Sequence, residues 1–97
     1  MRNKIFDMEP VDIAKALVCE VYNEKLSSVD DEALMPINLN LVWFCYILGG
    51  WKVLLVPTIR QPQPYYEVTF NTNDGEAYID TYHKVGNRKI SLVKSVV

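Results

Sequence analysis

The chain contains few of the residues that build metal centres and covalent frameworks. Its 97 residues include only two cysteines, Cys19 and Cys45, and one histidine, His83. Neither a Cys-x-x-Cys pair nor a cysteine–histidine spacing typical of zinc sites occurs, so we expect no metal and no other cofactor. Two cysteines so far apart in sequence also make no disulfide framework, which favours reduced thiols and a cytoplasmic location.

Long apolar runs and basic clusters are missing as well. A membrane-spanning helix needs roughly 18 or more consecutive apolar residues, and Gly49, Gly50 and Lys52 interrupt the longest candidate. The first ten residues show no apolar run of signal-peptide length. Lysines and arginines are scattered in a chain of net charge −2, whereas nucleic-acid binding normally needs a clustered basic face. We therefore expect neither a membrane nor a nucleic acid as partner.

The composition indicates one folded domain over residues 1–97. Hydrophobic residues make up 49% of the chain and charged residues 23%, which is ordinary globular usage. A chain of this length buries one modest core, and little is left for a deep cleft beside it.

One amphipathic helix is predicted over about residues 10–26. Pro10 suits the first turn, where its missing N–H costs nothing. Apolar residues then recur at helical spacing, at Val11, Ala14, Leu17, Val18 and Val21. Polar residues fall on the opposite side, at Asp12, Lys15, Glu20 and Asn23. Cys19 lies on this polar side, and we expect it to be exposed.

A sheet is predicted over about residues 39–96. Branched and aromatic residues dominate "LNLVWFCYIL", "WKVLLVPT", "YYEVTFN" and "EAYIDTYHKV", and "KISLVKSV" is a candidate fifth strand. Gly49-Gly50, "TNDG" and Gly86-Asn87 supply turns, and "IRQPQP" supplies a loop. The predicted fold class is α+β, an N-terminal helix packed on a four- to five-stranded antiparallel β-meander.

The first predicted strand is apolar on both faces, although a half-covered antiparallel sheet should alternate apolar and polar residues. Regular alternation gives two sets, Leu41, Trp43, Cys45 and Ile47 on one side and Val42, Phe44, Tyr46 and Leu48 on the other. One helix covers one face only. The second face needs cover from the rest of the chain, from a second copy or from a different protein. Which set faces the helix stays open.

Candidate binding residues all come from the sheet. The apolar candidates on the second face are either Val42, Phe44 and Tyr46 or Trp43, Cys45 and Ile47. A polar group consists of Lys52, Glu67, Tyr78, Asp80 and Tyr82. This group could hold a small polar ligand, although we favour cross-strand pairing of solvated residues as the explanation.

Catalytic residues are not indicated. Asp80 and His83 lie three residues apart on a predicted strand, so their side chains point to opposite faces. Cys45 lies in the most apolar strand, where burial raises a thiol pKa and suppresses its nucleophilicity. Because no acid, base and nucleophile can be placed within reach of each other, we expect a protein that is not an enzyme.

The sheet residues resemble a known pattern. The motifs are Val42-Trp43-x-Cys45, Trp51-Lys52-x-Leu54-Leu55, Tyr65-Tyr66-Glu67 and Tyr78-x-Asp80-x-Tyr82. Together they resemble a family of small uncharacterised proteins encoded by phages and prophages of Gram-positive bacteria. The resemblance spans residues 41–84, and "IRQPQP" and the tail after Lys84 depart from the pattern. It implies phage or prophage origin and the cytoplasm of a bacterial host, and it implies no reaction.

Two functions are compatible with these observations. The first is a non-enzymatic phage or prophage accessory protein that binds a host protein, or a second copy as a homodimer, through an apolar sheet face. The alternative is a protein that binds or sequesters a small nucleotide-like ligand through the polar group.

Overall fold

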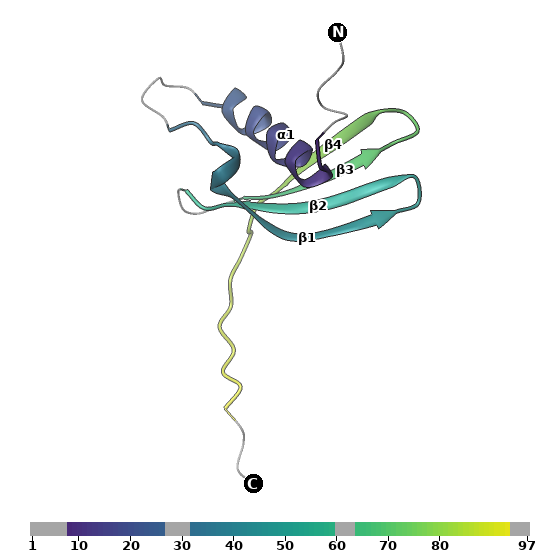
Figure 1. Cartoon of the computed structure of the whole chain (residues 1–97). Helices are drawn as coiled ribbons and strands as arrows, with labels where there is room; N and C mark the ends of the chain where they lie inside the picture. Colours follow the sequence, from purple (N-terminus) through teal and green to yellow (C-terminus); the bar gives the residue numbers. More distant parts are fainter. Residues whose placement is uncertain (1–7, 27–31, 60–63, 94–97) are drawn as a thin grey trace.

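The computed structural model describes residues 8–26, 32–59 and 64–93. Within these residues the elements are α1 (Pro10–Glu24), η2 (Pro36–Asn38), β1 (Leu39–Ile47), β2 (Gly50–Pro57), β3 (Tyr65–Asn71) and β4 (Glu76–Tyr82). The strands form one antiparallel sheet in the order β1-β2-β3-β4. Helix α1 lies across one face of this sheet (Figure 1). The predicted α+β meander is confirmed, with four strands.

Helix α1 begins at Pro10, as predicted, but buries a different stripe from the expected one. Its buried residues are Ile13, Ala14, Val18 and Cys19. Val11 and Val21 are only half-buried. The stripe is shifted around the helix because Ile13 packs into the core, and this shift brings Cys19 inside. The expectation of an exposed Cys19 is therefore wrong.

The core lies between α1 and the sheet. Alternate residues of the two central strands point to the helix and are buried, namely Trp51, Val53 and Leu55 of β2 and Tyr66 and Val68 of β3. The rings of Trp51 and Phe70 stack at a centroid distance of 5.0 Å, with their planes 5° apart. This period-2 burial is the pattern of a sheet covered on one face only.

A β-bulge interrupts β1. Leu41 and Trp43 pair with adjacent residues of β2, so Val42 is an extra residue without a partner in the register. Beyond the bulge the alternation shifts by one residue. As a result Leu41 and Phe44 lie on the helix side, whereas Trp43 lies on the opposite side. The prediction that Leu41 and Trp43 share a face is wrong for this reason.

Glycines at the two hairpins have two different roles. Gly49 and Gly75 have positive φ values of 82° and 66°, a conformation that glycine adopts without strain. Gly50 is already the first residue of β2. A Cβ atom at Gly50 would collide with the backbone carbonyl of Phe70, so this glycine allows a close approach of two strands and is not a turn residue.

An extended segment replaces the predicted fifth strand. Residues 83–93, here called the arm, contain no strand or turn, and they project away from the body of the molecule (Figure 1). The hairpin expected at Gly86-Asn87 is therefore absent from the described part of the chain. Residues 94–96 of the predicted strand and residues 60–63 of the predicted loop lie outside the described residues.

An asparagine joins the end of α1 to the segment that leads into β1. The Asn23 side-chain amide donates to the Leu34 carbonyl oxygen at 3.1 Å, and its Oδ1 accepts from the Leu34 N–H at 2.8 Å. Leu34 is 1% exposed. The two hydrogen bonds satisfy both backbone groups of a residue whose side chain fills the core.

Candidate functional site

The sheet face opposite α1, here called the open face, is assembled in cross-strand rows. Paired residues of antiparallel strands point to the same side of the sheet. One row runs through Trp43, Leu54, Glu67 and Asp80, and the next through Cys45, Lys52, Thr69 and Tyr78. A further pair at the end of β3 and β4 is Tyr65 and Tyr82. Every strand of the sheet therefore contributes to this face.

The structure shows which of the two apolar sets of β1 lies on the open face. Trp43, Cys45 and Ile47 lie on it. Phe44 lies on the helix side, where its ring centroid is 6.3 Å from that of Trp51. Tyr46 lies on the helix side at the sheet edge and is 75% exposed. The structure thus separates Phe44 and Tyr46 from the polar candidates.

Large apolar and aromatic side chains are exposed across the open face. Trp43 and Ile47 are each 38% exposed, and Tyr78 is 58% exposed. Leu54 is half-buried between them. Exposed apolar groups of this kind, gathered on one surface, are typical of interaction sites, and tyrosine and tryptophan are enriched at protein interfaces.

A small polar cluster lies within this apolar surface. Lys52 Nζ is 3.7 Å from Glu67 Oε1, and the Tyr82 hydroxyl donates to the same Glu67 oxygen at 3.4 Å. The charge of Glu67 raises the pKa of Tyr82, with smaller contributions from burial, from Asp80 and from the hydrogen bond. The predicted polar group is therefore brought together around Glu67. Asp80 of β4 pairs directly with Glu67, and Tyr78 lies in the same cross-strand row as Lys52.

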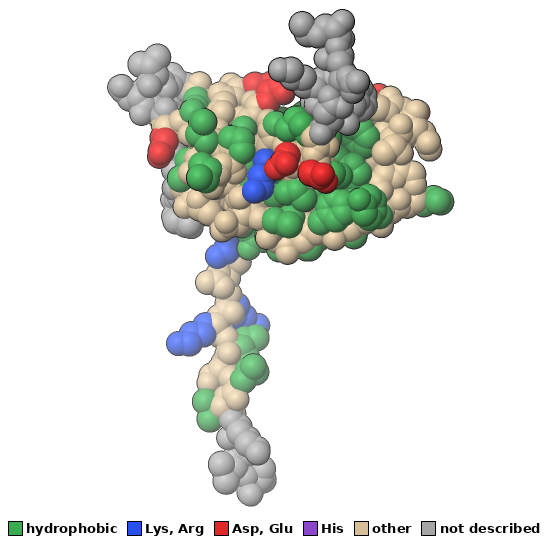
Figure 2. Space-filling view, viewed as in Figure 1, with side chains coloured by type: hydrophobic (Ala, Val, Ile, Leu, Met, Phe, Trp, Pro, Cys, Tyr) green, Lys and Arg blue, Asp and Glu red, His purple; other side chains and the backbone are tan. Residues whose placement is uncertain are grey.

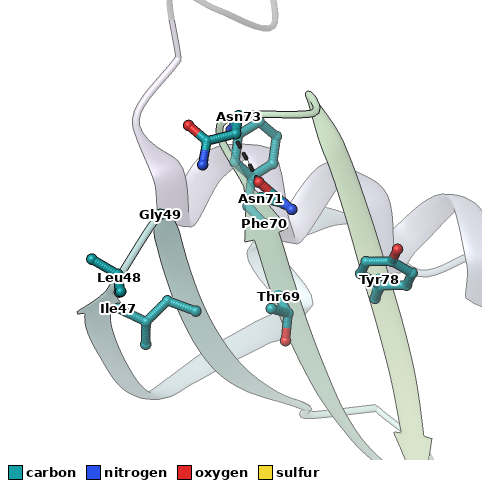
Figure 3. Close-up of a pocket in the computed structure, with 8 residues that line it drawn as sticks. All are labelled: Ile47, Leu48, Gly49, Thr69, Phe70, Asn71, Asn73 and Tyr78. Atoms are coloured by element: carbon teal, nitrogen blue, oxygen red, sulfur yellow. Dashed lines mark hydrogen bonds between the residues drawn. The ribbon is translucent and has the colours of Figure 1, made fainter.

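A shallow depression lies on the sheet near its two hairpin turns (Figure 3). Its volume is about 210 Å³, and it is lined by Ile47, Leu48, Gly49, Thr69, Phe70, Asn71, Asn73 and Tyr78. Asn71 Oδ1 accepts from the backbone N–H of Asn73 at 3.0 Å, which holds one rim of the depression in place. Of the predicted polar group, only Tyr78 lines this depression.

The predictions for the two cysteines are wrong, because Cys45 was expected to be buried and Cys19 to be exposed, and the structure shows the opposite. Cys45 is exposed because it points out of an edge strand on the uncovered side. Cys19 is buried, and burial raises the pKa of its thiol. The described residues contain no group of three His, Cys, Asp or Glu side chains that could hold a metal ion.

Sequence reasoning missed Leu54 and Tyr65 as members of the open face. A signal for Leu54 was present, because it is two residues from Lys52 on a strand and must share its face. Trp43 was named in one of the two alternative sets for this face, but the bulge that separates it from Leu41 leaves no mark in an entirely apolar strand.

These features define a small α+β protein in which one helix covers one side of a four-stranded sheet and leaves the other side exposed. The chain belongs to the DUF6275 family, a family of unknown function, which matches residues 11–92. The expectation of an uncharacterised family is thus confirmed, and the matched range includes most of the arm. Neither a curated protein nor a solved structure matches the chain. Among the described residues, no helix is long and apolar enough to cross a membrane.

Proposed function

We propose that the protein is a non-enzymatic accessory protein that acts by binding another protein through its open face. The observation that carries this proposal is the uncovered face itself, with Trp43, Ile47 and Tyr78 exposed around a half-buried Leu54. Binding hot spots are enriched in tryptophan and tyrosine and lie near the centre of a contact surface. Trp43 and Tyr78 are the anchors that we assign to this surface.

The shape of the open face favours a protein over a small ligand. Ligand pockets usually have volumes of about 300–1,000 Å³ and enclose most of the ligand, whereas the depression near the hairpin turns measures about 210 Å³. Among the described residues, a broad surface with a depression of this size matches the flat contact area of a protein partner better than a ligand pocket.

The electrostatics of the polar cluster weaken the nucleotide-like alternative. Lys52 already pairs with Glu67, and Asp80 adds a second carboxylate beside Glu67 in the register. A phosphate would therefore meet two negative groups for one positive group. Its approach would also have to compete with the existing ion pair.

The biological setting that we propose is a bacterial cell that carries a phage or prophage. It is supported by the motifs that begin at Val42-Trp43-x-Cys45, which resemble small phage and prophage proteins of Gram-positive bacteria. In this setting the partner is a host protein in the bacterial cytoplasm.

Affinity capture with two matched tyrosine variants tests the proposal. Tyr78 lies on the open face and Tyr46 on the helix side, and both are more than half exposed. We expect tagged wild type and Tyr46→Glu to retain the same partner from a host lysate, and Tyr78→Glu to lose it while keeping its thermal unfolding temperature. Undiminished capture by folded Tyr78→Glu would contradict the proposal. Thermal stabilisation by a member of a nucleotide panel would favour the alternative.

A further inference from the structure

The arm is a part of the family domain that has no role in the fold of one copy. The family match continues to Leu92, so nearly all of the arm belongs to the shared domain. Val85, Leu92 and Val93 are each at least 82% exposed, and Ile90 is 65% exposed. Such apolar side chains contribute to stability only when another surface covers them.

Charge is distributed unequally between the arm and the body. Residues 1–82 contain all twelve acidic residues and six of the ten basic ones, which gives a net charge of −6. Residues 83–97 contain four basic residues and no acidic one. Figure 2 shows cations and apolar side chains along the arm, and carboxylates on the body. The arm is therefore complementary in charge to the body of its own kind of chain.

The edge of the sheet at β4 offers a place for an added strand. Strand β4 pairs with β3 on one side, and no described strand pairs with its other side. An open edge presents unpaired N–H and C=O groups that can template another strand. Ala77 and Ile79 are half-buried on the helix side of this edge and pack against the core, so an adjacent apolar strand would extend their burial.

The arm has the sequence pattern of the missing strand. Lys89, Ile90, Ser91 and Leu92 alternate polar and apolar residues with period 2, which is the pattern of a half-covered strand. We propose that two copies exchange their arms, so that residues 88–93 of each copy pair antiparallel with β4 of the other. Each sheet then gains a fifth strand, and the interaction is reciprocal, as in a two-fold symmetric dimer.

The alternation of the arm fixes which of its side chains face the helix, and the charge of Lys89 selects the register, because only one register places Lys89 directly beside Asp80. With Ile90 beside Ile79 of the other copy, Leu92 falls beside Ala77 on the helix side, and Lys89 falls beside Asp80 on the open face. A slip of one residue would instead place Lys89 and Ser91 on the helix side, and register is strongly specified where one face is buried. The proposal rests on the arm and the β4 edge, and it does not depend on binding at the open face.

Charge reversal across the predicted Lys89–Asp80 pair tests the exchange. Wild type is expected to be a dimer in light scattering, and a chain that ends at Lys84 a monomer. Asp80→Lys and Lys89→Asp, each purified separately, place like charges at both symmetric contacts. We expect each to dimerise roughly tenfold to a hundredfold more weakly than wild type. Glu20→Lys, which changes an exposed helix residue, is the matched control and is expected to dimerise normally.

Mixing the two variants distinguishes exchange from a hairpin within one chain. A heterodimer of Asp80→Lys with Lys89→Asp restores an opposite-charge pair at both contacts, so the mixture should recover dimers close to wild-type strength. A hairpin with the same pairs inside each chain would gain nothing from mixing. A monomeric wild type, a dimer that survives removal of the arm, or a mixture without recovery would each overturn the proposal.

Discussion

Replacing Asn23 by alanine tests the hydrogen-bonded connection between α1 and the strand that follows. The side chain of Asn23 donates to the Leu34 carbonyl and accepts from the Leu34 N–H. Alanine removes both partners at once. Because Leu34 is buried, its backbone groups are left with restricted access to water, and an unsatisfied buried group costs more than the net contribution of an average hydrogen bond.

The magnitude follows from two opposing terms. Loss of the two hydrogen bonds, with Leu34 left unpaired, costs about 2–3 kcal/mol. Alanine has a higher helix propensity than asparagine, which returns about 0.5 kcal/mol in the last turn of α1. The net loss is about 2 kcal/mol of unfolding free energy, which corresponds to a decrease in Tm of roughly 8–16 °C for a domain of this size.

Urea unfolding followed by circular dichroism measures this loss directly. The matched control is Asn40→Ala, an exposed asparagine of β1, which should stay within about 0.5 kcal/mol of wild type. If Asn23→Ala also stays within that range, the two hydrogen bonds contribute nothing to stability and the reasoning is refuted.

Two further predictions concern a glycine and a tyrosine. Gly50→Ala should destabilise the fold by about 3 kcal/mol or more, because its Cβ would collide with the Phe70 carbonyl. Gly86→Ala is the control and should be neutral, since Gly86 has open space around it. Equal thermal stability of the two variants would contradict this prediction. The charge of Glu67 raises the pKa of Tyr82, so the folded state favours the protonated phenol. The stability that this preference contributes is complete below the pKa of Tyr82 in the unfolded chain, about 10, and is lost as pH rises through the higher pKa of Tyr82 in the folded protein. Glu67→Gln should lower the pKa of Tyr82 in an ultraviolet tyrosinate titration, with Tyr82→Phe as reference, and an unchanged titration would rule out the assigned cause.

The parts of the fold with strong local signals were predictable from the sequence. Pro10 marks the start of the helix because its ring suits the first turn. The four strands follow from branched and aromatic runs between turn residues. Each of these features depends on interactions within a few residues.

The features that position the candidate site depend on tertiary contacts. The bulge at Val42 turns Trp43 to the open face, and a strand that is apolar on both sides gives no period-2 signal from which to locate it. The environment of Cys19 depends on how α1 is rotated against the sheet. Asn23 was expected on the solvated helix side, and its contact with Leu34 spans eleven residues.

Cys45 provides a native probe of the open face. Its thiol is exposed in the row of Lys52 and Tyr78. Cys19 is buried and its thiol pKa is raised, so alkylation under native conditions should modify Cys45 selectively. A bulky adduct at Cys45 would stand within the proposed contact surface, and the Cys45→Ser variant treated with the same reagent controls for modification elsewhere.

The most direct test of binding through the open face is therefore partner capture after complete modification of Cys45 with a bulky maleimide. We expect modified wild type to lose the partner, whereas treated Cys45→Ser retains it and both proteins keep the same thermal stability. Equal capture by fully modified wild type would contradict the central claim, because a partner could not then occupy the face on which Cys45 lies.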